Sequence, residues 1–467
     1  MNVTSASTDE VNAAAEAASA AFYSFGRSAP ALRARLLRSI ADGIERLGDV
    51  LIESAARETA LAKLRLVGER GRTCAQLRMF ADIAEANHWI DECVEAADPA
   101  RAPQPKPKIR SRFVPLGPVV VFGASNFPLA FSVAGGDTAS ALAVGCPVIV
   151  KAHPAHPETS ALVGNVVSAA VLECALPAGV FSMLFDNGFD VGVALVKHPL
   201  IMAGAFTGSR SGGVALWRVA QGRPRPIPFF AEMSSVNPIF VFPGAAAAKA
   251  QILATGLHAS ITGSVGQLCT KPGLVFVVDD AATKSWLDVL APLVSQSSPA
   301  MMLTPAIRST CQRHITERAS IEGVRSLVQT AAPSGSTLVG AALMAVDAET
   351  FLRTPALHDE IFGPTSLIVH CSGPKDFLRC ARALEGQLTA TVWAEPHELK
   401  GEDEFLWTLE QRAGRLVFNG FPTGVEVGRA TVHGGPFPST TDSRFTSVGT
   451  RAFARFIRPV AYQNELI

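Results

Sequence analysis

One cysteine of the sequence stands in a segment that could present a nucleophile to a ligand. The segment is Ser260-Ile-Thr-Gly-Ser-Val-Gly-Gln-Leu-Cys269-Thr270, whose glycines and small hydroxyl residues allow a ligand to approach backbone amides. A thiolate is the strongest ordinary nucleophile in proteins, although most intracellular cysteines are small buried apolar residues. We predict Cys269 as the nucleophile, and we expect the nearby Lys271 to help lower its pKa.

Three polar residues could assist such a thiol. Glu232 stands in the uncharged segment 226–235, where desolvation is expected to raise its pKa towards that of a usable base; the alternative is a salt-bridged glutamate at a domain junction. Asn126 directly follows an apolar strand, where its amide could donate to a developing oxyanion or cap the next helix. Glu360, in His358-Asp-Glu-Ile-Phe-Gly-Pro364, could equally be an exposed turn residue.

The composition places these residues in a large globular protein. The 467 residues are 48% hydrophobic and 18% charged, which excludes a disordered chain, and amount to about three domains. Equal numbers of basic and acidic residues, 41 each, lack the basic excess of a nucleic-acid binder. Eight cysteines without a CxxC pair argue against a disulfide framework or a zinc module, so we expect no metal and a reducing, cytoplasmic location.

Two segments bear on targeting. The first ten residues lack a basic run followed by an apolar one, so a secretory signal is not expected. The uncharged stretch 113–136 is long enough to span a bilayer, but its prolines and glycines fit a strand, a loop and a buried helix better. We therefore expect a soluble protein without a membrane partner.

The apolar pattern predicts helices first and then two alternating α/β series. Helical spacing covers 9–25 and 31–62, and a Pro-rich, basic stretch around 99–112 predicts an edge hairpin. Short apolar runs then predict buried parallel strands at 119–122, 148–150 and 201–206, with helices at 132–144 and 158–174. The second series comprises strands at 239–242, 274–278, 338–346, 367–369, 391–393 and 416–418, with helices at 248–260 and 282–295. The fold class predicted is α/β, with two doubly wound domains and a cleft between them.

The dinucleotide signal is weak. No GxGxxG follows the first strand, but Phe206-Thr-Gly-Ser-Arg-Ser-Gly-Gly213 follows a strand and precedes a helix at 214–220. The N-terminus of a helix can bind a phosphate, so this loop is a candidate anion site.

Six segments, in order, resemble the aldehyde dehydrogenase superfamily across nearly the whole chain. They are Ser125-Asn-Phe-Pro128, Val150-Lys151, Phe206-Thr-Gly-Ser209, Glu232, Gly266-Gln-Leu-Cys269 and Glu360-Ile-Phe-Gly-Pro364. The resemblance implies a cofactor domain at 1–103 and 117–231, a catalytic thiol domain at 232–440 and an oligomerisation β-element at 104–116 and 441–467. It also implies pairing of that element between subunits, hence a homodimer or homotetramer.

The resemblance implies a role for each matching residue. Cys269 would attack an aldehyde, Asn126 and the Cys269 backbone N–H would hold the oxyanion, and Glu232 would activate the water that releases the acid. Glu360 and Phe362 would hold the nicotinamide ribose. Lys151 and Ser209 would bind the adenosine ribose and the phosphates.

One difference from many NAD-preferring relatives predicts the cofactor. They have an acidic residue three positions after the strand-end lysine, where this sequence has Pro154, and Arg210 follows Ser209. Loss of a carboxylate and gain of a guanidinium favour a 2′-phosphate, so NADP is the expected cofactor, with NAD as the second. His153 could contribute or be a surface histidine without a role.

Several segments resemble the branch that oxidises 2,5-dioxopentanoate (α-ketoglutarate semialdehyde) to 2-oxoglutarate. They are Lys151-Ala-His-Pro-Ala-His-Pro157, the segment 227–238, the segment 419–427 and His433-Gly-Gly-Pro436. Arg223, Arg225, Arg415 and Arg429 are candidates for binding the substrate carboxylate. NADP-dependent fatty aldehyde dehydrogenases are the alternative, with Phe127, Phe131 and Phe421 lining an apolar tunnel.

A cysteine hydrolase would need a histidine near the thiol, and the nearest in sequence, His258, shows no suggestive pattern.

Overall fold

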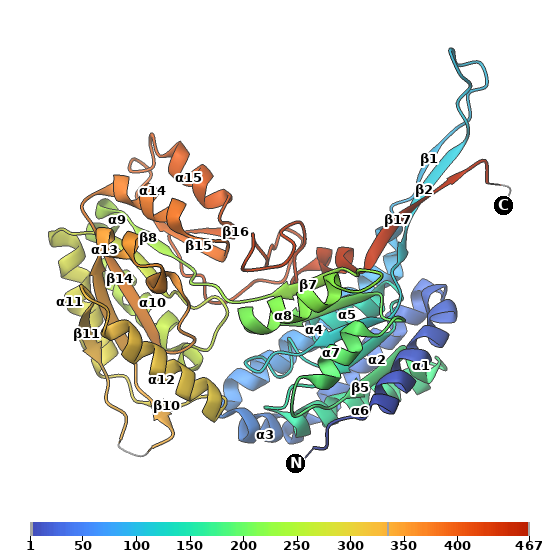
Figure 1. Ribbon diagram of the computed structural model, residues 1–467, viewed down its shortest axis with the longest axis horizontal. Coiled ribbons are helices and arrows are strands. Elements are labelled where there is room, and N and C mark those ends of the chain that lie inside the picture. Colours follow the sequence, from blue (N-terminus) through green and yellow to red (C-terminus); the bar gives the residue numbers. More distant parts are fainter. Residues whose placement is uncertain (1–2, 334–335, 466–467) are drawn as a thin grey trace.

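The computed structural model describes residues 3–333 and 336–465, which form two lobes and a projecting arm (Figure 1). The chain begins with helices, as the apolar spacing predicts. Ser7 and Glu10 form a capping box at the start of the first helix, and Gly48, with a φ of 54°, separates the helical pattern of 31–62 into two helices. The N-terminal helices are α1 (Thr8–Gly26), α2 (Pro30–Arg46), α3 (Gly48–Thr59) and α4 (Lys63–Ala86), followed by η1 (His88–Ile90).

The first lobe contains a five-stranded parallel sheet in the order β5-β4-β3-β6-β7. Its strands are β3 (Val119–Phe122), β4 (Val148–Lys151), β5 (Phe181–Leu184), β6 (Ala203–Thr207) and β7 (Phe229–Glu232). Its helices are α5 (Gly136–Ala143), α6 (Pro157–Glu173), η2 (Ala178–Val180), α7 (Asp190–Lys197) and α8 (Arg210–Gln221). The first three predicted strands of this lobe are confirmed. The first crossover connects β3 to β4 through α5.

The helix predicted over 132–144 begins later than expected, at Gly136. Residues 124–135 form turns, and a Cβ at Gly135 would lie 2.5 Å from the carbonyl oxygen of Ala130. This tight approach ends the turn segment and sets where the helix starts. The prediction that helical structure begins at Ser132 is therefore wrong.

The second lobe contains a seven-stranded sheet in the order β11-β13-β14-β9-β8-β15-β16, parallel except for its edge strand β11. Its strands are β8 (Ile239–Val241), β9 (Leu274–Val278), β11 (Arg325–Gln329), β13 (Ala342–Asp347), β14 (Thr365–Cys371), β15 (Gln387–Trp393) and β16 (Ala413–Phe418). Its helices are α9 (Pro243–Ala248), α10 (Ala250–Thr262), η3 (Gly263–Gly266), α11 (Ala281–Ser295), α12 (Pro305–Ala319), α13 (Ala348–Arg353), η4 (Pro355–His358), α14 (Pro374–Ala383) and α15 (Asp403–Glu410). The two α/β domains are thus present as predicted.

The strand predicted over 338–346 is divided in the structure. Residues Leu338–Val339 form β12, which pairs with β10 (Ala300–Met301), and β13 begins only at Ala342. Between them a Cβ at Gly340 would lie 1.9 Å from the carbonyl oxygen of Thr330, so only glycine fits this crossing. The apolar run gave no sign of this break.

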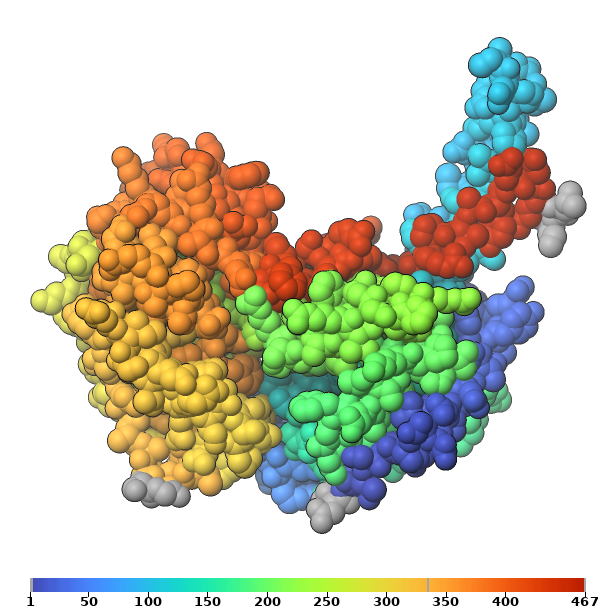
Figure 2. Space-filling view, in the orientation of Figure 1, coloured from blue at the N-terminus to red at the C-terminus, as the bar shows by residue number. Residues whose placement is uncertain are grey.

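The arm is a three-stranded antiparallel sheet that projects from the first lobe (Figures 1 and 2). Its strands are β1 (Cys93–Glu95), β2 (Ile109–Pro115) and β17 (Ile457–Gln463). The predicted oligomerisation element overlaps this sheet, whereas η5 (Thr450–Phe456) packs in the core of the first lobe through Ala452 and Phe456. The domain limits given above stay a prediction. Among the described residues, no helix has the length and apolar character needed to cross a membrane.

Candidate active site

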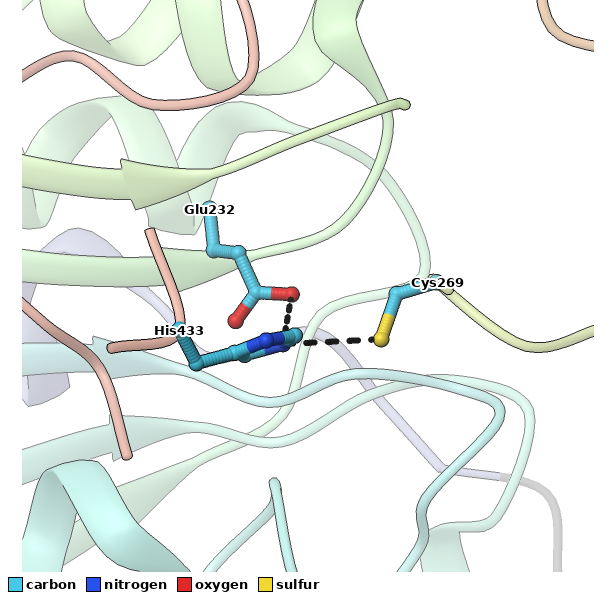
Figure 3. Close-up of side chains that lie close together, drawn as sticks. All are labelled: Glu232, Cys269 and His433. Atoms are coloured by element: carbon cyan, nitrogen blue, oxygen red, sulfur yellow. Dashed lines mark hydrogen bonds and ion pairs between the residues drawn. The ribbon is translucent and has the colours of Figure 1, made fainter. Parts of the chain in front are cut away.

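Three side chains from distant parts of the chain meet between the lobes (Figure 3). Glu232 is the last residue of β7, Cys269 lies in the loop between η3 and β9, and His433 lies in the segment that follows β16. The Nε2 atom of His433 lies 2.9 Å from Glu232 Oε1 and 3.6 Å from Cys269 Sγ. The three ligand atoms lie within 4.8 Å of one another. This donor set would also suit a transition metal, so the expectation of no metal stays a prediction.

The loop that carries Cys269 is held from two sides. Asn237, fully buried, donates from Nδ2 to the carbonyl oxygens of Cys269 and Lys271 at 2.9 and 3.0 Å. Gly266, with a φ of 66°, lies so close to Gly363 that a Cβ would be 2.1 Å from its carbonyl oxygen. The loop of Cys269 and the Glu360–Pro364 segment are therefore fixed against each other.

His433 governs the state of Glu232. Because Nε2 faces a carboxylate oxygen, it carries the proton and donates to it. The Ser447 hydroxyl donates to the other oxygen, Oε2, at 2.8 Å. Burial favours a higher pKa for Glu232, but the charge of His433 and the hydrogen bonds from His433, Ser447 and Cys269 outweigh it, so its pKa lies below the ordinary value. The expectation that desolvation raises the pKa of Glu232 is wrong, because a histidine 201 residues away pairs with it.

The thiol of Cys269 is held protonated in this state. Burial raises its pKa well above the ordinary value, and the negative charges of Glu232 and Glu360 raise it further, against the attraction of Arg72. Lys271 does not act as expected: it is buried, its Nζ donates to the carbonyl oxygens of Ile361 and Thr365, and its charge interacts with Glu360. The ionised Glu232 is therefore the group placed to accept the thiol proton.

Asn126 lies against the same loop. Its buried side chain donates from Nδ2 to the carbonyl oxygen of Gln267 at 3.0 Å, two residues before the nucleophile. Its own carbonyl oxygen accepts from Arg65 on α4 at 2.6 Å. The next helix, α5, begins ten residues later, so the alternative of a helix cap is not what the structure shows.

Lys151 and Ser209 lie at the carboxyl edge of the five-stranded sheet. Lys151 ends β4, and Ser209 caps α8 by accepting from the backbone N–H of Gly212 at 3.2 Å. Arg210 is not free: its guanidinium forms a bidentate ion pair with Glu385 at 2.6 and 3.1 Å. His153 stacks on His156, and burial, with the charges of His156 and Lys151, lowers its pKa well below the ordinary value. At neutral pH His153 is therefore uncharged.

Glu360 and Phe362 lie in the loop before β14. Burial raises the pKa of Glu360 to about 7, against the charge of Lys271 and hydrogen bonds from Ser234 and Ser235. The backbone N–H of Arg210 donates to the Ser234 hydroxyl at 3.3 Å, so Ser234 links the start of α8 to Glu360. Phe362 is half-buried and packs against an apolar cluster that includes Leu61, Leu66 and Leu303.

A narrow cavity of about 20 Å³ borders Cys269. It is lined by Arg72, Phe127, Phe131, Leu268, Cys269, Thr270, Gly424, Val425 and His433. Its free volume is about that of one water molecule, so an aldehyde of several carbons can enter only if lining side chains move. Phe127 and Phe131 are in edge contact in its wall, with ring centroids 5.2 Å apart, whereas Phe421 packs on Trp393 instead.

None of the four arginines predicted to bind a substrate carboxylate lines the cavity beside Cys269. Arg223 is buried and donates to four backbone carbonyl oxygens near β6, so it stabilises the first lobe. Arg225 and Arg429 are exposed and line no part of the cavity beside Cys269. Arg415 holds the carbonyl oxygens of Pro422 and Gly424 and thereby supports the cavity wall.

Sequence reasoning missed His433 and Arg72. His433 is 164 residues from Cys269, and its only signal was the flanking Gly-Gly-Pro, which permits close packing. Arg72 lies on α4, where arginine is an ordinary surface residue. No local pattern distinguishes Arg72 from its neighbours, and the Gly-Gly-Pro beside His433 does not indicate what its side chain contacts.

The chain matches the Aldehyde dehydrogenase family over residues 1–453. It is 49% identical over 455 residues to alpha-ketoglutaric semialdehyde dehydrogenase 2 of Azospirillum brasilense, covering 97% of this chain and 87% of that protein. It is 45% identical over 460 residues to the alpha-ketoglutaric semialdehyde dehydrogenase of Acinetobacter baylyi, covering 98% and 87%.

Solved structures show the same fold at low sequence identity. A mutant of 1-pyrroline-5-carboxylate dehydrogenase from Thermus thermophilus superposes with a TM-score of 0.84 at 23% identity, covering 98% of this chain and 86% of that one. Glyceraldehyde-3-phosphate dehydrogenase from Methanocaldococcus jannaschii, complexed with NADP, gives 0.82 at 18% identity, covering 99% and 96%. With the sequence match, the fold and the clustered thiol, carboxylate and amide in agreement, this chain belongs to the aldehyde dehydrogenase family.

Proposed function

We propose that the chain oxidises 2,5-dioxopentanoate to 2-oxoglutarate through a thioester on Cys269. The observation that carries the proposal is the Cys269 thiol within 4.8 Å of the ionised Glu232 carboxylate, in a chain 49% and 45% identical to two alpha-ketoglutaric semialdehyde dehydrogenases. The fatty aldehyde alternative is not favoured, since the two relatives at 49% and 45% identity are both named for alpha-ketoglutaric semialdehyde.

Addition to the aldehyde is the first step of the proposed mechanism. Glu232 accepts the thiol proton while Cys269 Sγ forms a bond to the aldehyde carbon, and the carbonyl oxygen becomes an alkoxide. The Asn126 amide and the Cys269 backbone N–H are the donors available to that oxygen. One such donor stabilises a transition state by about 2.7–4 kcal/mol. Loss of hydride from the adduct leaves a thioester.

Hydrolysis of the thioester is the second step. Glu232, after releasing its first proton, accepts a proton from a water molecule, whose oxygen attacks the acyl carbon. The bond to sulfur breaks, the carboxylic acid leaves, and Cys269 is regenerated. His433 is a positioning residue here: its Nε2–H holds the carboxylate in place and keeps it ionised at neutral pH.

A nicotinamide dinucleotide fits the donors at the carboxyl edge of the first sheet. Lys151 supplies a cation, and α8 begins after the carboxyl end of β6, where such sheets bind dinucleotide phosphates. The N–H groups of Arg210 and Gly212 would exchange their bonds to Ser234 and Ser209 for bonds to a phosphate. Glu360, in the loop before β14 of the second lobe, supplies an acceptor for a ribose hydroxyl. Bound there, the cofactor supplies the hydride acceptor for the oxidation.

NADP preference over NAD forms a further part of the proposal. Its support is Pro154 in place of an acidic residue and Arg210 at the start of α8, although the ion pair to Glu385 engages that guanidinium and His153 is uncharged. Because both partners are largely exposed, the pair is weak and can open for a phosphate. Arg210→Ala should lower the ratio of kcat/KM with NADP⁺ to that with NAD⁺, and Glu385→Gln should raise it. An unchanged ratio in both variants would exclude Arg210 from cofactor selection.

Assembly and location are also proposed. The projecting sheet of β1, β2 and β17 presents the exposed Val94, which supports pairing between subunits in a homodimer or homotetramer. All eight cysteines are free, which supports a reducing, cytoplasmic location. Sedimentation of the whole chain and of a variant lacking β17 tests the pairing.

The substrate is tested by comparing kcat/KM for 2,5-dioxopentanoate and for decanal, each with both cofactors. We expect a large advantage for the keto acid. A large advantage for decanal would overturn the substrate while leaving the family and the thiol mechanism intact.

A further inference from the structure

The wall of the catalytic cavity contains a guanidinium without a partner. Arg72, on α4, lines the cavity beside Cys269, and its Nε and Nη2 atoms are buried. Within residues 3–333 and 336–465, neither atom has a hydrogen-bond acceptor, and no other arginine has two such atoms. Burial of a charge without partners costs free energy, so this arrangement needs an explanation.

Two fully buried arginines in the same lobe are satisfied by the protein. Arg33 donates to the carbonyl oxygens of Ala143 and Ser28, and Arg455 forms an ion pair with Asp137 at 2.7 Å. The buried acid nearest to Arg72 along its own helix, Glu69, accepts instead from the backbone N–H groups that follow Asn126. Arg72 is therefore left with no acceptor of its own.

The two unpaired atoms form one edge of the guanidinium. Nε–H and an Nη2–H bond point in parallel, and this edge is the one that binds both oxygens of a carboxylate side by side. The face of Arg72 lies over the Phe131 ring, with Cζ 5.3 Å from the ring centroid, which fixes the plane of the fork. The site is thus built for a planar anion.

We propose that Arg72 binds the carboxylate of the substrate while Cys269 attacks the aldehyde at the other end of the same molecule. The inference rests on the proposed oxidation of 2,5-dioxopentanoate, which carries its aldehyde and its carboxylate at opposite ends of a five-carbon chain. Both protein groups border one cavity, so one short substrate can contact both. Arg72 then selects aldehydes that bear an acid at the far end.

Two further arginines lie close to the cavity, and neither offers the same fork. Arg65 lies over the Phe127 ring, but its Nη2 donates to the carbonyl oxygen of Asn126 and only Nη1 is unpaired among its buried nitrogens. The second is Arg415. Its Nη1 and Nη2 donate to Gly424 and Pro422, which leaves only Nε unpaired. Its place is to shape the wall formed by Gly424 and Val425. Arg72 alone keeps two parallel donors for a ligand.

The test measures kcat/KM of the full chain for 2,5-dioxopentanoate, 5-oxopentanoate and uncharged pentanal. Arg72→Met should lower kcat/KM for the two acids by about 10- to 100-fold, mostly through KM, since hydrogen bonds to a charged group contribute about 1.5–3 kcal/mol. Loss of the Arg72 charge also removes an attraction that lowers the pKa of Cys269, and this acts on all three substrates alike. The kcat/KM for pentanal should therefore fall much less than that for the acids, so the ratio of acid to pentanal is the quantity that reports the carboxylate site. Arg72→Lys keeps the charge but not the two parallel donors, so its kcat/KM for the acids should lie between the values of the wild type and of Arg72→Met. Arg78→Met, on the exposed side of the same helix, is the matched control and should leave all three substrates unchanged.

The outcomes separate this inference from the proposed function. If the wild-type chain oxidises the acids and Arg72→Met does so equally well, the carboxylate site is refuted and the function stands. If kcat/KM for pentanal falls in Arg72→Met as much as kcat/KM for the acids, Arg72 is a structural residue and the inference is wrong. If the wild-type chain prefers pentanal to both acids, both the substrate and the inference are wrong. Should Arg72→Met fail to fold, Arg72→Gln takes its place, and its unfolding temperature is measured to show that the variant is folded.

Discussion

Replacement of His433 by asparagine should shift the pH dependence of the reaction to higher pH. His433 donates to Glu232 over 2.9 Å between side chains that are only 1% and 3% exposed. A hydrogen bond to a charged group contributes about 1.5–3 kcal/mol, and a tenfold change in proton affinity corresponds to about 1.4 kcal/mol. Loss of the donor therefore makes Glu232 about ten to a hundred times easier to protonate.

The direction of the pH shift follows from the protonation state in which Glu232 acts as a base. The folded protein lowers the pKa of this carboxylate, and the ionised form is the base, so activity is present above that pKa and lost as the pH falls through it. His433→Asn removes the group that lowers the pKa of Glu232 most, so burial raises this pKa without that opposition. The acid limb of kcat should therefore move up by about one to two pH units. At alkaline pH kcat should recover most of the wild-type value.

The assay is the steady-state rate of cofactor reduction as a function of pH. His258→Asn is the matched control, because His258 bonds to Ser297 away from the cavity and should leave the profile unchanged. Ser447→Ala removes a second donor to Glu232 and should shift the acid limb in the same direction by a smaller amount. An acid limb that stays in place in His433→Asn would refute the assigned role of this histidine.

Two further predictions concern the oxyanion donor and the catalytic loop. Asn126→Ala should lower kcat by about 10²- to 10³-fold with little change in unfolding temperature, because the amide acts on the transition state; a decrease below tenfold would argue against an oxyanion role. Gly266→Ala should lower the unfolding temperature strongly and reduce activity, since its Cβ would lie 2.1 Å from the Gly363 carbonyl oxygen at a φ of 66°. Gly263→Ala is the control, with its nearest neighbour 3.9 Å away, and equal effects of the two changes in a thermal melt would contradict the reasoning.

Buried strands were the most predictable part of the fold. The runs at 119–122 and 274–278 coincide with β3 and β9, because a strand covered on both faces is apolar throughout. The places where a helix starts late or a strand is divided were harder to predict. At Gly135 and Gly340 another backbone segment passes so close that only glycine fits, and the local sequence does not show which segment that is. Helix starts and strand divisions at such crossings therefore depend on tertiary structure.

The site was predictable in its residue types and not in its electrostatics. Cys269 and Glu232 lie within 4.8 Å of each other and Asn126 bonds to the Cys269 loop, whereas their roles stay predictions. The pKa of Glu232 moves in the opposite direction from the one its uncharged sequence neighbours suggest. The cause, His433, reaches the site from near the C-terminus of the chain. Charge states of buried groups depend on such distant contacts, which sequence spacing does not contain.

The thioester on Cys269 can be measured directly. Glu232→Gln removes the base of both steps, but it also removes one of the charges that raise the pKa of the thiol. At alkaline pH the thiolate should therefore still form and attack, whereas hydrolysis of the thioester lacks its base, so the acyl-enzyme should accumulate. After incubation with 2,5-dioxopentanoate and NADP⁺ and an acid quench, intact-protein mass spectrometry should show one acyl group per chain, mapped to Cys269 and released by hydroxylamine. Absence of this adduct under conditions in which the variant reduces the cofactor, or its location on another cysteine, would contradict the account.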